Sequence, residues 1–554
     1  MNLKHIHLFF LFLSLLVFPT PSELQSQSTP RLNQETGRVA DRLNEMQTKA
    51  SNEKYASWGH WGFQPNDYHQ WDQHSNRLIP VYTFGITLNQ WREEGSKYQD
   101  EEQIKALYGS VPTETLNPHA NYYDQTDIYR LQQQAVDEGY RHIILFVFDG
   151  MDWQTTRAAA TYKQGKVPYD SGRGIGLHFL EDYRVATDYA LVCTSSLLGS
   201  AKFDVNAQTV HNGNTLATGG YNPRRGGHAP WSEPTTTNYL IGKDREQPHT
   251  VTDSASSASS MTAGIKTYNG SINYTADGEQ VLPIARQLEL KSFKTGIVTS
   301  VPISHATPAA AYANNVTRKD YQDISRDMLG LPSVSHRDQP LRGLDVVMGG
   351  GWSPARQKDP GQGNNYLVGN RYLHESDMEK VNVDHGGQYV VATRQTNRSG
   401  HEVLKEATQK AVSENKRVLG FFGTQYDGHL PYQTADGQYN PADDLKGREE
   451  YSDQDLIENP TLAQMTESAL DYLAADKGKF WLMIEAGDVD WANHANNIDS
   501  SIGAVLSGEA AFDVVMNWAD KNQVWEHTAI IVTSDHGHFF VNRQPQAIAE
   551  ASHP

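Results

Sequence analysis

The sequence predicts an α/β fold: a three-layer sandwich in which a large, mostly parallel central sheet has helices on both faces and carries loop-rich insertions. Two observations support this prediction. Continuous apolar runs recur along the chain, as expected for strands that are buried on both faces. Segments with helical composition lie between these runs, and such alternation favours a parallel sheet.

Five apolar runs are the expected strands. The first begins after a charged residue and ends at a glycine, which is typical of a buried strand. The runs are HIILFVFDG (142–150), KTGIVTSVP (294–302), RVLGFFG (417–423), KFWLMIEAG (479–487) and HTAIIVTSDHG (527–537). The expected helices cover residues 280–290, 401–415 and 460–475, with another inside 500–520.

The N-terminus has the composition of an export signal. Lys4 gives a positive start, and the apolar run at 8–18 is too short for a membrane-spanning helix, which takes about 20 residues. We therefore expect a signal peptide over residues 1–26 and a periplasmic or secreted protein. No stable membrane span is expected after signal removal; an uncleaved anchor is the alternative.

The remaining chain divides into two expected regions. Residues 27–139 are interpreted as an N-terminal extension that packs on the surface of the main domain, which covers residues 140–554. Loop-rich insertions are expected at about 153–248 and 355–400. A lone cysteine cannot form an internal disulfide, so Cys193 is interpreted as a small buried residue.

The net charge of −19 argues against nucleic acid as the main partner. Nucleic acid is not expected as a specific partner, because phosphate backbones require a basic surface. Small phosphorylated molecules stay open, since bound cations can invert the local field.

Acids and histidines gather where the expected strands end, the edge at which open parallel sheets bind ligands. Each alone has an ordinary explanation: an acid after a strand commonly caps a helix, and Asp490 with His494 could be a surface ion pair. Together, carboxylates and imidazoles favour zinc with magnesium. The candidate ligands are Asp149, His305, Thr307, Glu485, Asp490, His494, Asp535 and His536.

The stretch TVTDSASSASSMTAGIKTYNG (250–270) places serines behind one acid, Asp253. Ser254 is the candidate nucleophile, because nearby dications would lower the pKa of its hydroxyl and a helix N-terminus favours a phosphoryl group. The other small residues are interpreted as packing residues. Arg318 offers a planar fork for two phosphoryl oxygens, unless it is an ordinary surface arginine beside Lys319.

These pieces resemble the alkaline phosphatase family, and they occur in the family's order. The resemblance covers roughly residues 140–540 in separate blocks. The matching blocks are FDGM (148–151), VTDSASSASSMTAGIKTYNG (251–270), HATPAAAYANNVTRKDY (305–321), DVVMGGG (345–351), IEAGDVDWANHANN (484–497) and VTSDHGH (532–538).

The resemblance implies two zinc ions and one magnesium ion. It implies that Ser254 becomes phosphoserine and is a variable zinc ligand, and that Arg318 holds the phosphoryl group with Asp253 beside it. The implied ligands are Asp149, Asp535 and His536 for one zinc, Asp490 and His494 for the other, and Asp149, Thr307 and Glu485 for magnesium.

The chain departs from the bacterial archetype at several positions. His305 stands in place of an Asp at the third metal site, and Trp491 in place of a Lys; His538 is expected behind the ligands. The family supplies a further zinc histidine some tens of residues after His536, which this sequence does not reach. We interpret the C-terminus as truncated, with His553 as a substitute candidate.

The sequence thus predicts an exported alkaline phosphatase that hydrolyses small phosphate monoesters through a phosphoserine, and the family implies a homodimer. Three alternatives stay open. One is a diesterase or sulfatase of the same superfamily, although Arg318 and the Asp-Ser-Ala block favour the monoesterase. Another is an inactive relative that binds phosphate or metal. The last is a cell-surface adhesion protein.

Overall fold

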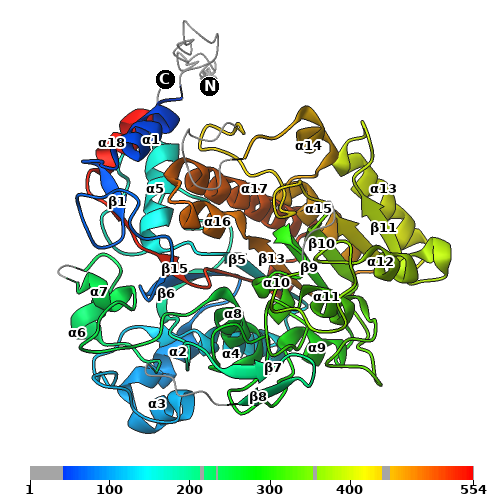
Figure 1. Ribbon diagram of the computed structural model, residues 1–554, viewed down its shortest axis with the longest axis horizontal. Coiled ribbons are helices and arrows are strands. Elements are labelled where there is room, and N and C mark those ends of the chain that lie inside the picture. Colours follow the sequence, from blue (N-terminus) through cyan, green and yellow to red (C-terminus); the bar gives the residue numbers. More distant parts are fainter. Residues whose placement is uncertain (1–40, 212–217, 233–234, 353–357, 440–448, 553–554) are drawn as a thin grey trace, which may run out of the picture. The chain divides into compact units, whose positions relative to one another are not determined.

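The computed structural model describes residues 41–211, 218–232, 235–352, 358–439 and 449–552. The expected signal peptide and His553 lie outside these residues. Ten strands form the central sheet in the order β11-β12-β10-β9-β13-β5-β14-β3-β6-β4. Figure 1 labels β11, β10, β9, β13, β5 and β6 of this sheet. Neighbouring strands are parallel except at β3, which runs antiparallel to both β14 and β6. The predicted α/β class with a mostly parallel sheet is confirmed.

The five expected strands all lie in this sheet, within a few residues of their expected ends. They are β5 (His142–Phe148), β9 (Phe293–Pro302), β12 (Arg417–Phe421), β13 (Lys479–Ala486) and β14 (Thr528–Thr533). The other five are β3 (Ile79–Phe84), β4 (Tyr123–Asp124), β6 (Thr187–Cys193), β10 (Val346–Gly350) and β11 (Tyr389–Thr393). Of these, β6 and β11 fall in the two stretches that were expected to be loop-rich insertions.

Both faces of the sheet are buried under helices. On β5, Ile144, Phe146 and Phe148 point into one core, while alternate residues point into the other. The first core also contains residues of α5 (Trp153–Gln164), α13 (Gly400–Ser413), α15 (Leu462–Leu473) and α17 (Ile498–Asn522). The second contains residues of α4 (Thr126–Asp137), α8 (Ser254–Ala263), α9 (Ile284–Glu289), α10 (Ala306–Ala310) and α11 (Tyr321–Leu329). This double burial explains the continuous apolar runs.

The N-terminal segment is part of the sheet and not only a surface extension. All six residues of β3 are buried between β14 and β6, because the run IPVYTF is apolar on both faces. Two short pairs tie this segment to the C-terminal region. β1 (Gly59–Trp61) pairs with β16 (Phe540–Asn542), and β2 (His74–Ser75) pairs with β15 (Gly537–His538).

The remaining elements are short, and several belong to loop-rich regions. Among the described residues, no helix combines the length and apolar composition needed to cross a membrane. Cys193 is buried, as expected. The remaining short elements of the fold are α1 (Arg42–Glu53), α2 (Asn89–Glu94), α3 (Glu101–Tyr108), β7 (Lys202–Asp204), β8 (Thr209–His211), α6 (Pro223–Gly226), α7 (Thr237–Leu240), α12 (Glu375–Val381), α14 (Asp453–Glu458), α16 (Asp488–His494) and α18 (Pro545–Ala551).

A matched pair of leucine variants tests the buried sheet. Leu482 in β13 is fully buried, whereas Leu290 is 82% exposed. We expect Leu482→Ala to lower the free energy of unfolding by about 2–5 kcal/mol, because it leaves a cavity in the core. Leu290→Ala should change it by less than about 0.5 kcal/mol. Chemical denaturation measures both, and equal losses would contradict the described core.

Candidate active site

The carboxyl ends of four neighbouring strands form the floor of the site. β9, β13, β5 and β14 are consecutive and parallel, so their last residues lie side by side. Asp149 follows β5, Asp535 follows β14, and Glu485 is the second-last residue of β13. The sheet therefore brings together acids that are far apart in the sequence, as predicted.

Ser254 lies at the start of α8, against this floor. The Asp253 side chain caps the helix by accepting from the backbone N–H of Ser256. The remaining hydroxyls are structural: Ser257 Oγ donates to the Asp535 carbonyl, and Ser260 Oγ donates to the carbonyls of Ser256 and Ile265. The small residues let α8 pack closely, and Ser254 Oγ faces His536 Nε2 at 3.2 Å.

A first ligand group surrounds the Ser254 hydroxyl. His536 Nε2 lies 3.3 Å from Asp149 Oδ1 and 3.4 Å from Asp535 Oδ2. Ligand atoms around a tetrahedral zinc ion, each about 2.0–2.1 Å from it, lie roughly 3.3 Å apart. The spacing and the mixture of imidazole, carboxylate and hydroxyl therefore fit zinc.

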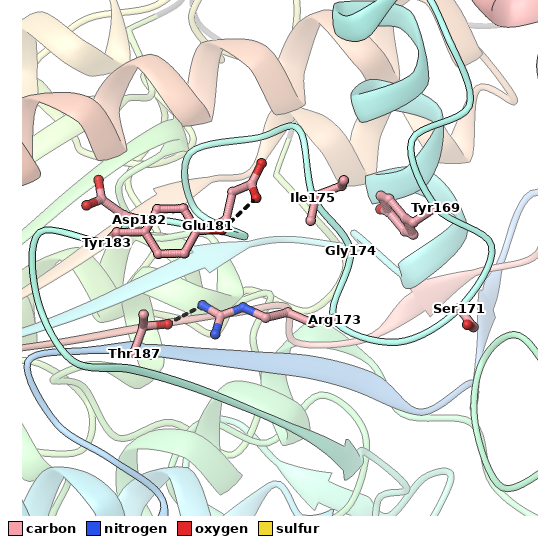
Figure 2. A pocket seen from close by; sticks show the side chains of 9 residues that line it. All are labelled: Tyr169, Ser171, Arg173, Gly174, Ile175, Glu181, Asp182, Tyr183 and Thr187. Atoms are coloured by element: carbon pink, nitrogen blue, oxygen red, sulfur yellow. Dashed lines mark hydrogen bonds between the residues drawn. The ribbon is translucent and has the colours of Figure 1, made fainter.

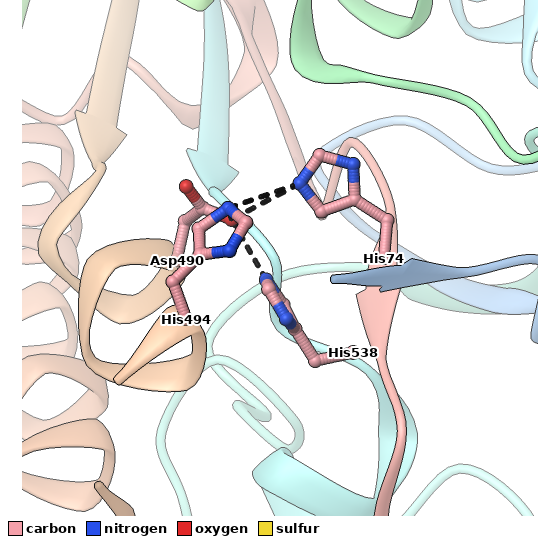
Figure 3. A group of neighbouring side chains, drawn as sticks. All are labelled: His74, Asp490, His494 and His538. Carbon is pink, nitrogen blue, oxygen red and sulfur yellow. Dashed lines mark hydrogen bonds and ion pairs between the residues drawn. The ribbon is translucent and has the colours of Figure 1, made fainter. Parts of the chain in front are cut away.

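A second group lies beside the first and contains Asp490, His494, His74 and His538 (Figure 3). Asp490 and His494 share one face of α16, as predicted from their spacing. His74 Nε2 lies 3.2 Å from His494 Nε2, and His538 Nε2 lies 2.7 Å from Asp490 Oδ1. His74 comes from β2, so the N-terminal segment reaches the site.

A third group contains Asp149, His305 and Glu485, with ligand atoms within 4.8 Å of one another. His305 is the N-cap of α10, and Thr307 is the second residue of that helix. Several oxygens here are buried without a hydrogen-bond partner in the described part of the chain, which is costly unless a cation binds them. They are both carboxylate oxygens of Asp149, Oδ2 of Asp535, Oε1 of Glu485 and Oγ1 of Thr307.

The electrostatics of the floor favour bound cations. Burial raises the pKa of Asp149 well above its ordinary value, and the neighbouring Asp535 and Asp490 raise it further. Burial also raises the pKa of Asp535 to about 7 and that of Glu485 to about 8. Burial lowers the pKa of His305 to about 3, so its imidazole stays neutral. Neutral imidazoles do not compensate the negative charge of the neighbouring carboxylates. Bound dications would compensate that charge.

A pocket of about 400 Å³ opens over these groups. Arg318 reaches into it and is held in place, since Nη1 donates to Asp253 Oδ2 at 3.0 Å and Nη2 to His305 Nε2 at 3.2 Å. Trp491 forms part of the wall and packs against His305 and His429. The residues that line the pocket are Asp72, Gln73, His74, Ser254, His305, Arg318, Asp427, Asp490, Trp491, His494 and Ala495.

Another hollow, of about 380 Å³, lies between Tyr169 and Thr187 (Figure 2). Its arginine, Arg173, is already bound to the Leu180 carbonyl and to Thr187 Oγ1. Glu181 accepts hydrogen bonds from the Gly176 amide and from Tyr183. This hollow gathers no cluster of acids and histidines, so it is a weaker candidate than the strand edge.

The structure brings together all the predicted site residues, Asp253, Trp491 and His538 included. His74 was missed, because it lies in the region expected to be an extension and 420 residues from His494. The signal that could have found it is the segment HSNRLIPVYTF (74–84), in which a histidine precedes a continuous apolar run.

Known proteins are similar in sequence to the part of the chain that contains this site. A family model described as alkaline phosphatase matches residues 232–549, more than half of the chain. Alkaline phosphatase 3 of Bacillus subtilis is 28% identical over 312 residues, 55% of this chain and 54% of that protein. Escherichia coli alkaline phosphatase is 27% identical over 315 residues, 54% of this chain and 61% of that protein. The chain thus spans little more than half the length of the curated relatives it matches.

The fold can also be compared with a solved structure. Alkaline phosphatase from Thermus thermophilus aligns with 24% identity and a TM-score of 0.43, over 72% of this chain and 60% of that chain.

Metal addition tests the cation-binding floor. We expect zinc and magnesium to raise the melting temperature of chelator-treated protein, because binding relieves carboxylate repulsion. A metal concentration of about 100 times Kd adds about 2.7 kcal/mol per site to the free energy of unfolding. Asp149→Asn should reduce this gain, whereas Asp137→Asn on the surface should keep it. Differential scanning calorimetry measures the shift. A metal-independent melting temperature in the unaltered protein would contradict the site.

Proposed function

The chain belongs to the alkaline phosphatase family, and on that premise we propose that it hydrolyses phosphate monoesters through a phosphoserine formed on Ser254. One observation carries the proposal. The Ser254 hydroxyl lies at a helix N-terminus, 3.2 Å from His536, in the pocket that also contains Arg318. A nucleophile, an anion-binding group and metal ligands therefore share one opening.

Substrate binding depends on Arg318 and the start of α8. The Asp253 carboxylate raises the pKa of the partly buried Arg318 guanidinium above its ordinary value, although desolvation alone would lower it, so the group stays cationic. Asp253 and His305 fix the planar fork, which can then donate to two phosphoryl oxygens. The helix N-terminus adds favourable potential for the anion.

The donor groups fit two zinc ions and one magnesium ion. One zinc would be held by Asp149, Asp535 and His536 next to Ser254, and the second by Asp490 and His494. Magnesium would be held by Asp149, Glu485 and Thr307, with His305 beside it. When bound, these ions supply positive charge that lowers the pKa of hydroxyl groups and neutralises the developing charge on oxygen.

The reaction then proceeds in two displacements at phosphorus. Ser254 Oγ loses its proton to solvent and attacks phosphorus, the bond between phosphorus and the ester oxygen breaks, and the alcohol leaves with a proton from solvent. Water next attacks the phosphoserine, which releases inorganic phosphate and restores the Ser254 hydroxyl. Through both steps Arg318 holds the phosphoryl oxygens, which is the positioning and charge compensation that phosphoryl transfer requires.

We further propose that the protein acts in the periplasm or after secretion. The positive start and short apolar run within residues 1–26 support export. Small phosphate monoesters are the proposed substrates, since Ser254 and Arg318 both line the pocket.

Replacement of the nucleophile tests the reaction. We expect Ser254→Ala to abolish both monoester turnover and acid-stable phosphoserine, measured with a radiolabelled monoester. Ser260→Ala on the same helix should retain both, because its hydroxyl only bonds backbone carbonyls. The unaltered enzyme should prefer the monoester to a diester and a sulfate ester. Phosphoenzyme in Ser254→Ala, or preferred turnover of another ester, would contradict the proposal.

Replacement of the arginine tests transition-state binding. We expect Arg318→Ala to lower kcat/KM roughly 100- to 1,000-fold, as loss of a group that stabilises developing charge does elsewhere. Lys319→Ala should leave kcat/KM unchanged, because that side chain is exposed. Steady-state kinetics on one monoester measures both variants. Equal effects at the two positions would show that Arg318 is not aimed at the substrate.

A further inference from the structure

The N-terminal segment crosses directly over α16 at the second ligand group. The carbonyl of Trp71 accepts from Asn496 Nδ2 at 2.8 Å, and the carbonyl of Asp72 accepts from His494 Nδ1 at 2.5 Å. Two residues later, β2 pairs with β15 and places His74 opposite His538. The backbone around His74 is therefore fixed from both sides.

The hydrogen bonds of the two histidines define where their protons lie. His74 Nδ1 lies 3.0 Å from the Thr252 carbonyl, and His494 Nδ1 lies against the Asp72 carbonyl. A carbonyl can only accept, so each Nδ1 carries the proton and each neutral ring presents a lone pair at Nε2. Histidines that bind a metal through one ring nitrogen commonly donate the N–H of the other to a backbone carbonyl in this way.

The two Nε2 atoms then face each other at 3.2 Å. Two lone pairs at this distance repel unless a positive charge lies between them. A metal cation accounts for the arrangement.

The distances distinguish His74 from His538 as the third donor. His74 Nε2, His494 Nε2 and Asp490 Oδ1 form a triangle with sides of 3.2, 3.4 and 3.7 Å. These sides are close to the roughly 3.3 Å expected between two ligands of one tetrahedral zinc. His538 Nε2 is only 2.7 Å from the same oxygen, which is a hydrogen-bond distance.

We infer that His74 is the third protein ligand of the zinc site begun by Asp490 and His494, and that His538 instead orients Asp490 by donating a hydrogen bond. The inference rests on the proposed zinc chemistry. It assigns to the N-terminal segment the role that the family resemblance implies for a histidine beyond His536. Segment 71–75 supplies one ligand and, through the Asp72 carbonyl, orients another.

The same substitution at both histidines tests the inference. Glutamine can place an amide N–H near the imidazole Nε2 position, so it can keep a donated hydrogen bond but offers no nitrogen lone pair. In the full chain, His74→Gln should weaken zinc at this site by more than about 100-fold, beyond the roughly 10- to 100-fold typical of groups behind a ligand. His538→Gln should stay within about 10-fold of the unaltered protein.

Zinc affinity is measured by competition with a chromophoric chelator, and stoichiometry by elemental analysis after dialysis. Cobalt substitution gives a spectroscopic readout: the visible absorption of one tetrahedral cobalt should be lost in His74→Gln and kept in His538→Gln. His69→Gln, which changes a nearby histidine bonded to Ser51, is the matched control and should bind zinc normally. Circular dichroism shows whether each variant is folded.

The outcomes separate the inference from the proposed function. If the unaltered protein hydrolyses monoesters and binds two zinc ions, but folded His74→Gln also binds both tightly, the inference is wrong and the function stands. Loss of zinc in His538→Gln with retention in His74→Gln would also overturn it. If metals bind as expected through His74 but no monoester is hydrolysed, the function fails and the ligand assignment stands. If His74→Gln does not fold, His74→Asn is used in its place, because asparagine can keep the hydrogen bond to the Thr252 carbonyl.

Discussion

The site depends on one constraint: several carboxyl groups must be buried at the adjoining ends of parallel strands. Asp149, Glu485 and Asp535 each expose an oxygen to the interior that no described donor satisfies. In a protein interior such groups are strongly destabilising unless charge compensates them. The sheet order places them close together whatever ion is bound, so the fold itself creates the demand for cations.

Close packing of α8 and of the turn at Gly150 positions the residues around the site. The small side chains of α8 let its N-terminus approach the floor, and their hydroxyls bond to carbonyls such as that of Asp535. A side chain at Gly150 would collide with His538 and with Asp490 at about 3 Å, so this turn requires glycine. Close packing thus sets the positions of the ligands as firmly as the strands do.

Local patterns were sufficient for five of the ten strands of the sheet and for the residues that follow them. The acids after β5 and β14 could be predicted, because a parallel sheet brings strand ends together. His74 and β3 could not be placed in the same way. Their partners lie across the whole chain, and β3 is antiparallel, so no alternation of strand and helix announces it. The strands β6 and β11 were missed because glycine-rich and polar loops surround them.

The pairing of β3 with β14 also determines when the site can form during synthesis of the chain. The ribosome makes residue 74 long before residue 494, and the loop between them must close before the imidazoles meet. Contacts of such wide sequence separation form slowly. A nascent chain can therefore pair β3 with β6 early, but it can pair β3 with β14 and complete the metal pocket only near the end of its synthesis.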